Sequence, residues 1–129
     1  MQRLYAVLAG ITLCLAPAAD GIAQDNGCGG ASFTEATSLS ALPVALRTVL
    51  ATGSPGGRIA DVNEAFNSTD VIFDIPDQRF LSGKLTQDCA AVLVELGRGQ
   101  YRKITIVFRR SGDAWTESTR IVTPPQWRR

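Results

Sequence analysis

The stretch that decides the fold covers residues 89–122, CAAVLVELGRGQYRKITIVFRRSGDAWTESTRIV. It contains three runs rich in apolar residues, at 90–96, 101–110 and 114–122, separated by short polar turns. Apolar and polar side chains alternate in the middle run, which is the period of a half-buried β-strand. The turns carry glycine and aspartate, which hairpin connections favour. The sequence therefore predicts a three-strand antiparallel meander.

The alternation in the middle strand predicts two different sheet faces. One face carries Ile104, Ile106 and Phe108. The other face carries Lys103, Thr105, Val107 and Arg109. The run at 114–122 alternates as a half-exposed edge strand does, since antiparallel sheets commonly bury one face and leave the other in water.

A helical pattern lies upstream of the meander. Its apolar face is formed by Leu42, Leu46, Val49 and Leu50. This spacing places all four side chains on one side of an α-helix. We expect Ser40 to cap the helix, Pro43 to occupy its first turn, and Gly53 to follow its last residue.

The segments around this helix give weaker signals. Residues 25–36 are polar and rich in glycine, and they predict an N-terminal arm. The run 70–75 (DVIFDI) predicts a strand, and Ser82-Gly83 predicts a turn. A helix followed by consecutive strands predicts an α+β domain. In this fold the N-terminal amphipathic helix packs on a small antiparallel sheet that ends in the meander.

Two cysteines, Cys28 and Cys89, remain if the first ~23 residues are removed as a signal peptide. In an oxidising compartment such a pair most often forms a disulfide. The bridge would join the N-terminal arm to the start of the meander. Closing a loop of this length stabilises a fold by about 4 kcal/mol in the chain-entropy model.

The N-terminus has the features of a secretory signal peptide. Arg3 is followed by the apolar run 4–16, and small residues precede possible cleavage points after Ala18 or Ala23. The apolar run is shorter than the ~20 residues that a membrane-spanning helix needs. We therefore assign residues 1–23 to a signal peptide and 24–129 to a single exported α+β domain. This domain is predicted to be soluble and periplasmic or secreted, with no membrane span.

The chain contains no histidine. This absence removes Ser-His-Asp and Cys-His nucleophile activation, most zinc sites and the side chain most often used for proton transfer near neutral pH. The sequence therefore predicts neither an enzyme nor a bound cofactor.

An acidic cluster is interpreted as caps, turns and surface charge, and two other interpretations are weighed against this one: a metal site and a catalytic carboxylate pair. Its members are Asp61, Glu64, Asp70, Asp74 and Asp77. The residue pattern of a calcium-binding loop is missing, so no metal site is predicted. Two of these carboxylates could serve a small hydrolase acting on envelope polymers, which is the alternative function that the sequence leaves open.

Basic and aromatic residues in the meander form the candidate binding face. They are Arg98, Tyr101, Arg102, Lys103, Arg109, Arg110, Trp115 and Arg120. Arginine with aromatic residues suits recognition of carboxylates, phosphates and protein surfaces. The same charges could instead protect the sheet edges from aggregation. They could also neutralise residues 24–88, in which acids outnumber bases.

These observations predict a small exported protein that binds another protein, as an inhibitor or accessory factor. An anionic envelope component is the other partner considered. Nucleic acid is not expected, because net charge is near neutral and no recognised binding motif is present. A small-ligand carrier would need an apolar pocket between helix and sheet. Asn67-Ser68-Thr69 also matches the N-glycosylation acceptor pattern.

Overall fold

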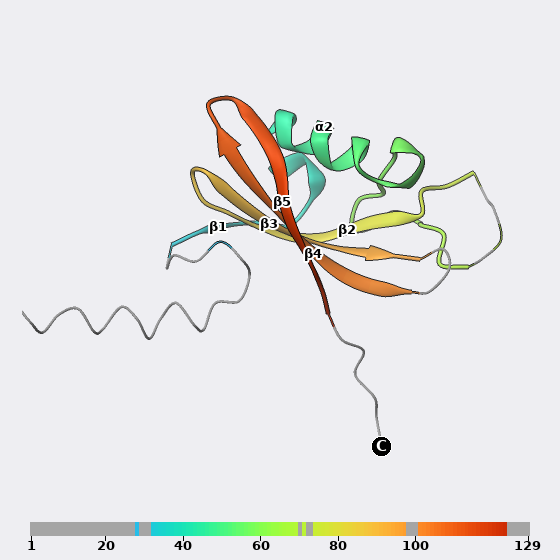
Figure 1. The fold of residues 1–129 in the computed structure, drawn as a ribbon. Helices are drawn as coiled ribbons and strands as arrows, with labels where there is room; N and C mark the ends of the chain where they lie inside the picture. The colour runs from blue at the N-terminus through green and yellow to red at the C-terminus, as the bar shows by residue number, and fades with distance from the viewer. Residues whose placement is uncertain (1–27, 29–31, 70, 72–73, 98–100, 124–129) are drawn as a thin grey trace, which may run out of the picture.

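Five β-strands form one antiparallel sheet whose spatial order follows the chain, β1-β2-β3-β4-β5 (Figure 1). The computed structural model describes residues 28, 32–69, 71, 74–97 and 101–123. The predicted signal peptide lies outside this part. The strands are β1 (Thr34–Ala36), β2 (Gln78–Leu85), β3 (Cys89–Leu96), β4 (Arg102–Ser111) and β5 (Ala114–Val122). The predicted meander is confirmed as β3-β4-β5.

Among the described residues one α-helix, α2 (Val44–Thr52), lies across one face of the sheet (Figure 1). Short 3-10 turns, η2 (Leu39–Ala41) and η3 (Pro55–Gly57), flank it. Pro43 occupies the N-cap position rather than the first turn, and Ser40 lies in η2. A residue that precedes proline is pushed out of the helical region. Leu42 is accordingly extended, and α2 begins only after Pro43.

The helix and the sheet enclose one hydrophobic core. Its buried members are Ala36, Leu42, Leu46, Leu50, Phe80, Ala90, Val92, Val94, Ile104, Ile106, Phe108 and Trp115. β3 and β4 contribute alternate residues to this cluster, the other strands contribute one residue each, and α2 contributes two side chains one helical turn apart. The α+β class predicted from the sequence is therefore confirmed.

The helix is not the first element of the domain, because β1 precedes it. β1 pairs antiparallel with β2, and Ala36 lies opposite Gly83. The sequence pattern missed this strand because only Ala36 of its three residues is buried. Pairing with β2, rather than local hydrophobicity, creates β1.

The strand expected at 70–75 is wrong. The described residues of that run, Val71, Asp74 and Ile75, lie in bends, and the strand forms downstream as β2. The turn predicted at Ser82-Gly83 is also wrong, because both residues lie within β2 next to a register shift. A Cβ at Gly83 would be 3.4 Å from the Leu42 side chain. Glycine here permits close packing rather than a turn.

A disulfide joins Cys28 to Cys89, as the sequence predicts. The two cysteines are separated by 61 positions, so the bridge fastens the N-terminal arm to the first residue of β3. Within the described part of the chain, no helix is both long enough and apolar enough to cross a membrane.

Candidate functional site

The sheet face turned away from α2 is the candidate site, and we call it the open face. Strand pairing and alternation assign to it Arg79, Ser82 and Lys84 of β2, Cys89, Ala91, Leu93 and Glu95 of β3, Lys103, Thr105, Val107 and Arg109 of β4, and Thr116, Thr119 and Ile121 of β5. No helix or strand of the described residues packs against this face (Figure 1). Its side chains range from exposed, such as Lys103 and Arg109, to buried, such as Ala91 and Val107.

Residues directly opposite one another form rows across the open face. Leu93, Thr105 and Ile121 make one row, with the first two half-buried and Ile121 40% exposed. The next row contains Val107, which is buried, beside the exposed Thr119. The centre of the face is thus apolar or threonine-rich.

Exposed cations flank these central rows. Lys103 and Arg109 lie on β4, on either side of Thr105 and Val107. Strands rise about 3.3 Å per residue, so the two cationic residues stand roughly 20 Å apart along β4. The face therefore combines an apolar middle with a positive residue at each end.

The predicted binding residues do not share one face. Lys103 and Arg109 lie on the open face, whereas their chain neighbours Arg102 and Arg110 lie on the side of the sheet that carries α2. Successive residues of a strand point to opposite faces, so adjacent cations are separated by the sheet itself. Arg98 lies outside the described residues.

Arg110 and Trp115 stabilise the β4-β5 hairpin on the helix side. The Arg110 guanidinium lies 5.9 Å from the centre of the Trp115 ring. Arg110 also donates hydrogen bonds to the carbonyl oxygens of Gly112, at 2.8 Å, and Gln87, at 3.2 Å. Trp115 is only 6% exposed. It is a core residue rather than part of an exposed surface.

Arg120 also lies on the helix side. Its Nε donates to Glu117 Oε2 at 2.6 Å, and both side chains are about one-third exposed. A Cβ at Gly53 would be 3.9 Å from Arg120 Nη2, so the guanidinium lies near the C-terminal end of α2. A positive charge is favourable there because the helix dipole is negative at that end.

An ion pair that the sequence did not predict lies on the open face, and its carboxylate is buried. Arg79 Nε donates to Glu95 Oε1 at 2.7 Å, and Glu95 is 5% exposed. Tyr101 Oη donates to Glu95 Oε2 at 2.6 Å. Arg79 also lies over the Phe66 ring at 4.3 Å and donates to the Glu64 carbonyl oxygen at 3.0 Å. These contacts hold the 58–77 segment against the sheet.

The close approach of this segment also explains Gly97. Its backbone N–H donates to the Asp77 carbonyl oxygen at 3.0 Å. A Cβ at Gly97 would overlap the backbone of Asn67 and Ser68, so only glycine fits without movement of the chain. The sequence places Gly97 in the turn between the first two meander strands and gives no sign of this contact, because the segment is about 30 positions away.

The hydrogen bond to Glu95 raises the pKa of Tyr101 above its ordinary value of 10.0, and partial burial adds to the effect. This bond stabilises the fold at lower pH, and its contribution is lost as pH rises from 10.0 through the raised pKa. Tyr101 is the only tyrosine of residues 24–129. We expect an alkaline absorbance titration of that domain to give a midpoint above 10.0.

The matched variant for this prediction is Tyr101→Phe. At neutral pH it should unfold with a free energy about 1 kcal/mol lower than that of the natural sequence, because one hydrogen bond to a carboxylate is lost. The difference should shrink as pH rises above 10.0. An equal difference at all pH values would show that the phenol does not donate to Glu95.

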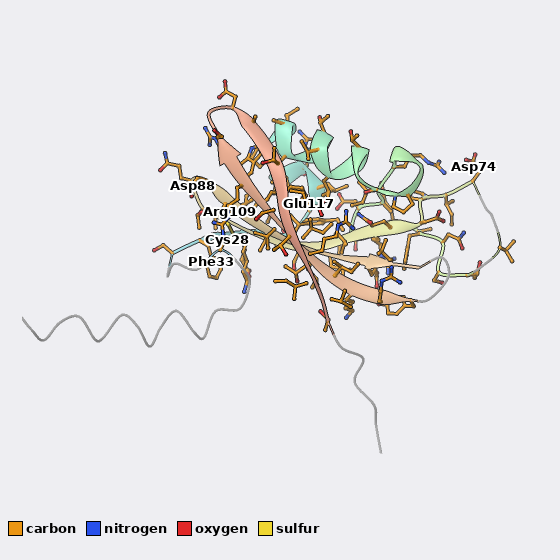
Figure 2. The ribbon with its side chains drawn as sticks, in the orientation of Figure 1. Cys28, Phe33, Asp74, Asp88, Arg109 and Glu117 are labelled. Atoms are coloured by element: carbon orange, nitrogen blue, oxygen red, sulfur yellow. A yellow bond between two sulfur atoms is a disulfide. The ribbon has the colours of Figure 1, made fainter. Side chains whose placement is uncertain are left out.

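The described residues of the acidic cluster make separate contacts and do not converge on one site. Asp61 Oδ1 accepts the backbone N–H groups of Leu39 and Val62, at 2.9 and 2.7 Å. Glu64 accepts the backbone N–H of Asp61 at 2.9 Å, which is the capping-box arrangement. Asp74 is fully exposed (Figure 2) and pairs with Arg58. Asp70 lies outside the described residues, and those residues contain no group of three metal-binding side chains.

Asn67 is 2% exposed and takes part in local backbone structure. Its Nδ2 donates to the Val71 carbonyl oxygen at 2.7 Å, and its Oδ1 accepts from the backbone N–H and hydroxyl of Thr69. A glycosyl transfer would need that Nδ2 to be accessible. The folded domain therefore does not present Asn67 as a glycosylation acceptor.

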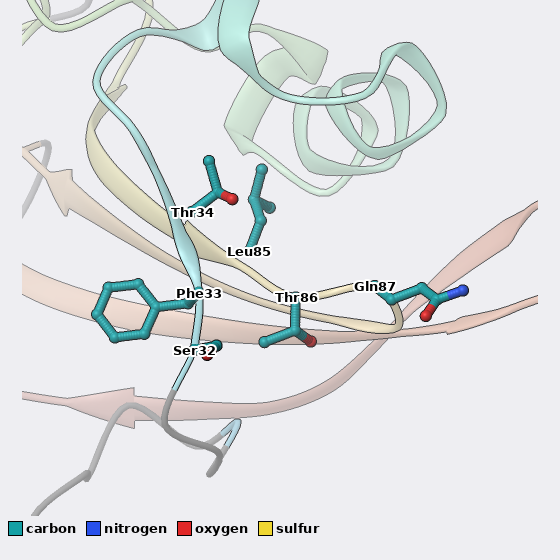
Figure 3. A pocket seen from close by; sticks show the side chains of 6 residues that line it. All are labelled: Ser32, Phe33, Thr34, Leu85, Thr86 and Gln87. Atoms are coloured by element: carbon teal, nitrogen blue, oxygen red, sulfur yellow. The ribbon is translucent and has the colours of Figure 1, made fainter.

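A hollow of about 500 Å³ lies at the edge of the sheet (Figure 3). It is lined by Ser32, Phe33, Thr34, Leu85, Thr86 and Gln87. None of these side chains is charged, and the hollow lies beside β1 rather than between α2 and the sheet. The pocket that a small-ligand carrier would need is filled instead by core side chains such as Leu46 and Phe80, both 0% exposed.

Comparison with known proteins found no relative of this chain. A scan against protein-family models, a search of curated proteins and a search of solved structures each returned no match.

Proposed function

We propose that this is a small exported, periplasmic or secreted, non-catalytic protein that binds another protein through the open face. The partner presents an apolar surface to the row of Leu93, Thr105 and Ile121. It presents acidic groups to Lys103 and Arg109. An inhibitor or accessory factor works in this way, since it needs a rigid surface rather than reacting groups.

The observation that carries the proposal is the composition of the open face. A solvated sheet face is ordinarily polar. Here Ile121 is 40% exposed beside a half-buried Leu93, with a cation on either side along β4. Protein interfaces have this anatomy, in which an apolar centre supplies affinity and a charged rim steers association.

The scaffold suits recognition by a preformed surface. The open-face residues lie on β2 to β5, which are paired along their length, and the disulfide fastens the start of β3 to the N-terminal arm. A surface held in place loses little conformational entropy on binding, so more of the contact energy is available as affinity. The bridge also fits the oxidising compartment that export implies.

The hydrolase alternative receives less support from the acidic residues considered for it. Asp61 and Glu64 accept backbone N–H groups, and Asp74 is fully exposed. A catalytic pair needs one carboxyl group held protonated by burial. The buried carboxylate of the described residues is Glu95, which accepts hydrogen bonds from Arg79 and Tyr101 rather than facing a second carboxyl group.

The test is capture of a partner by the oxidised 24–129 domain as bait in envelope and secreted extracts, under mild cross-linking. The open-face variant is Lys103→Glu/Arg109→Glu. The control is Arg58→Glu/Arg102→Glu, which makes the same change in net charge away from the open face. Circular dichroism and thermal unfolding verify that both variants fold.

We expect one protein in stoichiometric amount, retained by the control and bound about tenfold or more weakly by the open-face variant. Equal binding by the two variants would overturn the assignment of the face. Capture of an anionic polymer without a protein would favour the envelope component as partner. Turnover of that polymer, lost when Asp61 to Asp77 are substituted, would favour the hydrolase.

A further inference from the structure

We propose that two copies of this chain associate by pairing their β5 strands antiparallel across a two-fold axis, which joins two sheets into one. This inference does not rest on the proposed binding function. It rests on the free edge of β5, on the directions of its backbone groups and on the charges of Glu117 and Arg120.

The outer edge of β5 is open. In the described part of the chain β5 pairs with β4 alone. Residues 116–123 are all exposed. An edge strand leaves alternate backbone N–H and C=O groups without a partner on its outer side, and such an edge accepts another strand.

Strand alternation shows which residues of β5 direct their backbone groups outward. Gly112 and Asp113 form a two-residue turn, so the flanking pair Ser111 and Ala114 is hydrogen-bonded. Every second residue then faces the other way, and the backbone groups of Trp115 and Glu117 point outward.

The second half of β5 follows the same rule from its other end. The Thr123 backbone N–H donates to the Lys103 carbonyl oxygen at 3.0 Å. Counting back from this bond, the backbone groups of Arg120 and Val122 point outward. The outward-pointing residues are therefore odd-numbered up to Glu117 and even-numbered from Arg120. This change comes from the bulge in β5, where Val107 lies opposite Thr119 but Phe108 lies opposite Glu117.

One two-fold register uses all four of these outward-pointing residues. It places Glu117 opposite Arg120 of the second copy, and Trp115 opposite Val122 of the second copy. Opposed residues must also share a sheet face, and all four side chains lie on the helix side. In a strand without a bulge, an odd-numbered and an even-numbered residue, such as 117 and 120, would have side chains on opposite faces and could not be paired in this way. The bulge makes this register consistent.

The charges favour the same register. Within one copy Glu117 and Arg120 form an ion pair at 2.6 Å. In the paired arrangement each carboxylate also meets the second copy's guanidinium, so four charges of alternating sign surround the two-fold axis. Opposite charges directly across a strand pair are stabilising and like charges are destabilising. Val122, 54% exposed in one copy, is paired with a residue of the second copy in this register.

The bulge also argues that the occupant is a second copy rather than an unrelated strand. If a regular strand paired with β5, opposed side chains would share a sheet face on one side of the bulge. On the other side of the bulge, the opposed side chains would point to opposite faces. A second β5 carries the same irregularity at the two-fold axis. When β5 pairs with a second β5, opposed side chains therefore share a sheet face on both sides of the bulge.

Sedimentation analysis of the oxidised 24–129 domain at several micromolar concentrations tests the proposal. We expect a reversible dimer. The single variants Glu117→Arg and Arg120→Glu place like charges across the axis, and each should weaken self-association by about tenfold or more. The double variant Glu117→Arg/Arg120→Glu exchanges the charges and should restore the dimer.

The decisive experiment mixes the two single variants. A copy carrying Glu117→Arg meets a copy carrying Arg120→Glu with opposite charges at both contacts, so the mixture should dimerise although each variant alone does not. Loss of the intrachain ion pair affects both variants equally and cannot produce this rescue. A natural domain that is monomeric at all concentrations would overturn the proposal. So would a dimer unaffected by either reversal.

Discussion

Reduction of the Cys28–Cys89 bridge is expected to lower the free energy of unfolding of the 24–129 domain by about 4 kcal/mol. The cysteines are 61 positions apart, so the bridge removes many conformations from the unfolded chain. Small domains have total stabilities of roughly 5–15 kcal/mol, and the loss is therefore a large fraction of the total.

Urea unfolding with and without reductant measures this effect. The double variant Cys28→Ala/Cys89→Ala separates the missing cross-link from the chemistry of free thiols. Cys89 is 1% exposed, and alanine leaves no unpartnered polar group in its place. Reduced protein and double variant should unfold at similar urea concentrations, well below the oxidised protein. Equal stability with and without reductant would contradict the cross-link as a major source of stability.

Arg79→Ala is the substitution for which we expect the second large effect. Glu95 is 5% exposed, and removal of Arg79 leaves the Glu95 carboxylate buried with the hydrogen bond from Tyr101 but without its ion pair. Breaking a buried ion pair on one side costs about 3–5 kcal/mol. The Arg79 side chain is 28% exposed, so we expect a loss of about 3 kcal/mol, at the lower end of that range.

Arg58→Ala is the matched control for this substitution. Arg58 also pairs with a carboxylate, that of Asp74, but both side chains are at least half exposed. Exposed ion pairs contribute little to stability, so the free energy of unfolding should not change measurably. Arg79→Lys keeps the charge and loses the planar guanidinium. Its free energy of unfolding should lie between those of Arg79→Ala and Arg58→Ala. If Arg79→Ala and Arg58→Ala lowered the free energy of unfolding equally, the Arg79–Glu95 ion pair would contribute no more to stability than the exposed pair.

Hydrogen exchange distinguishes local from global effects of Arg79→Ala. Arg79 holds the segment that contains Glu64 and Phe66 against β2. Amide protection in the 58–77 segment should decrease more than protection in β3 and β4. Uniform loss of protection across the sheet would assign Arg79 to global stability alone.

Much of the fold follows from local pattern. Alternation in β4 identified its two faces, and the apolar spacing of Leu46 and Leu50 identified the helix face. These predictions succeeded because each side chain's environment is set by its own element and the next one along the chain. The same locality explains the meander, in which β3, β4 and β5 are joined by short turns.

The predictions that failed depend on distant contacts. β2 was missed because its strand is interrupted by a bulge and contains Gly83, which packs against Leu42 from a different element. The ion pair of Arg79 with Glu95 joins residues 16 positions apart across two strands. Neither contact leaves a periodic signal in the sequence.

The sequence by itself determined the α+β class, the meander, the apolar face of α2 and the pairing of Cys28 with Cys89. Side-chain period and cysteine count are properties of the chain before it folds. Only the tertiary structure decided that β1 and β2 complete the sheet, and that adjacent cations of β4 lie on opposite faces of it. The reason is physical: register and face are set by pairing between strands, whereas periodicity describes one strand at a time.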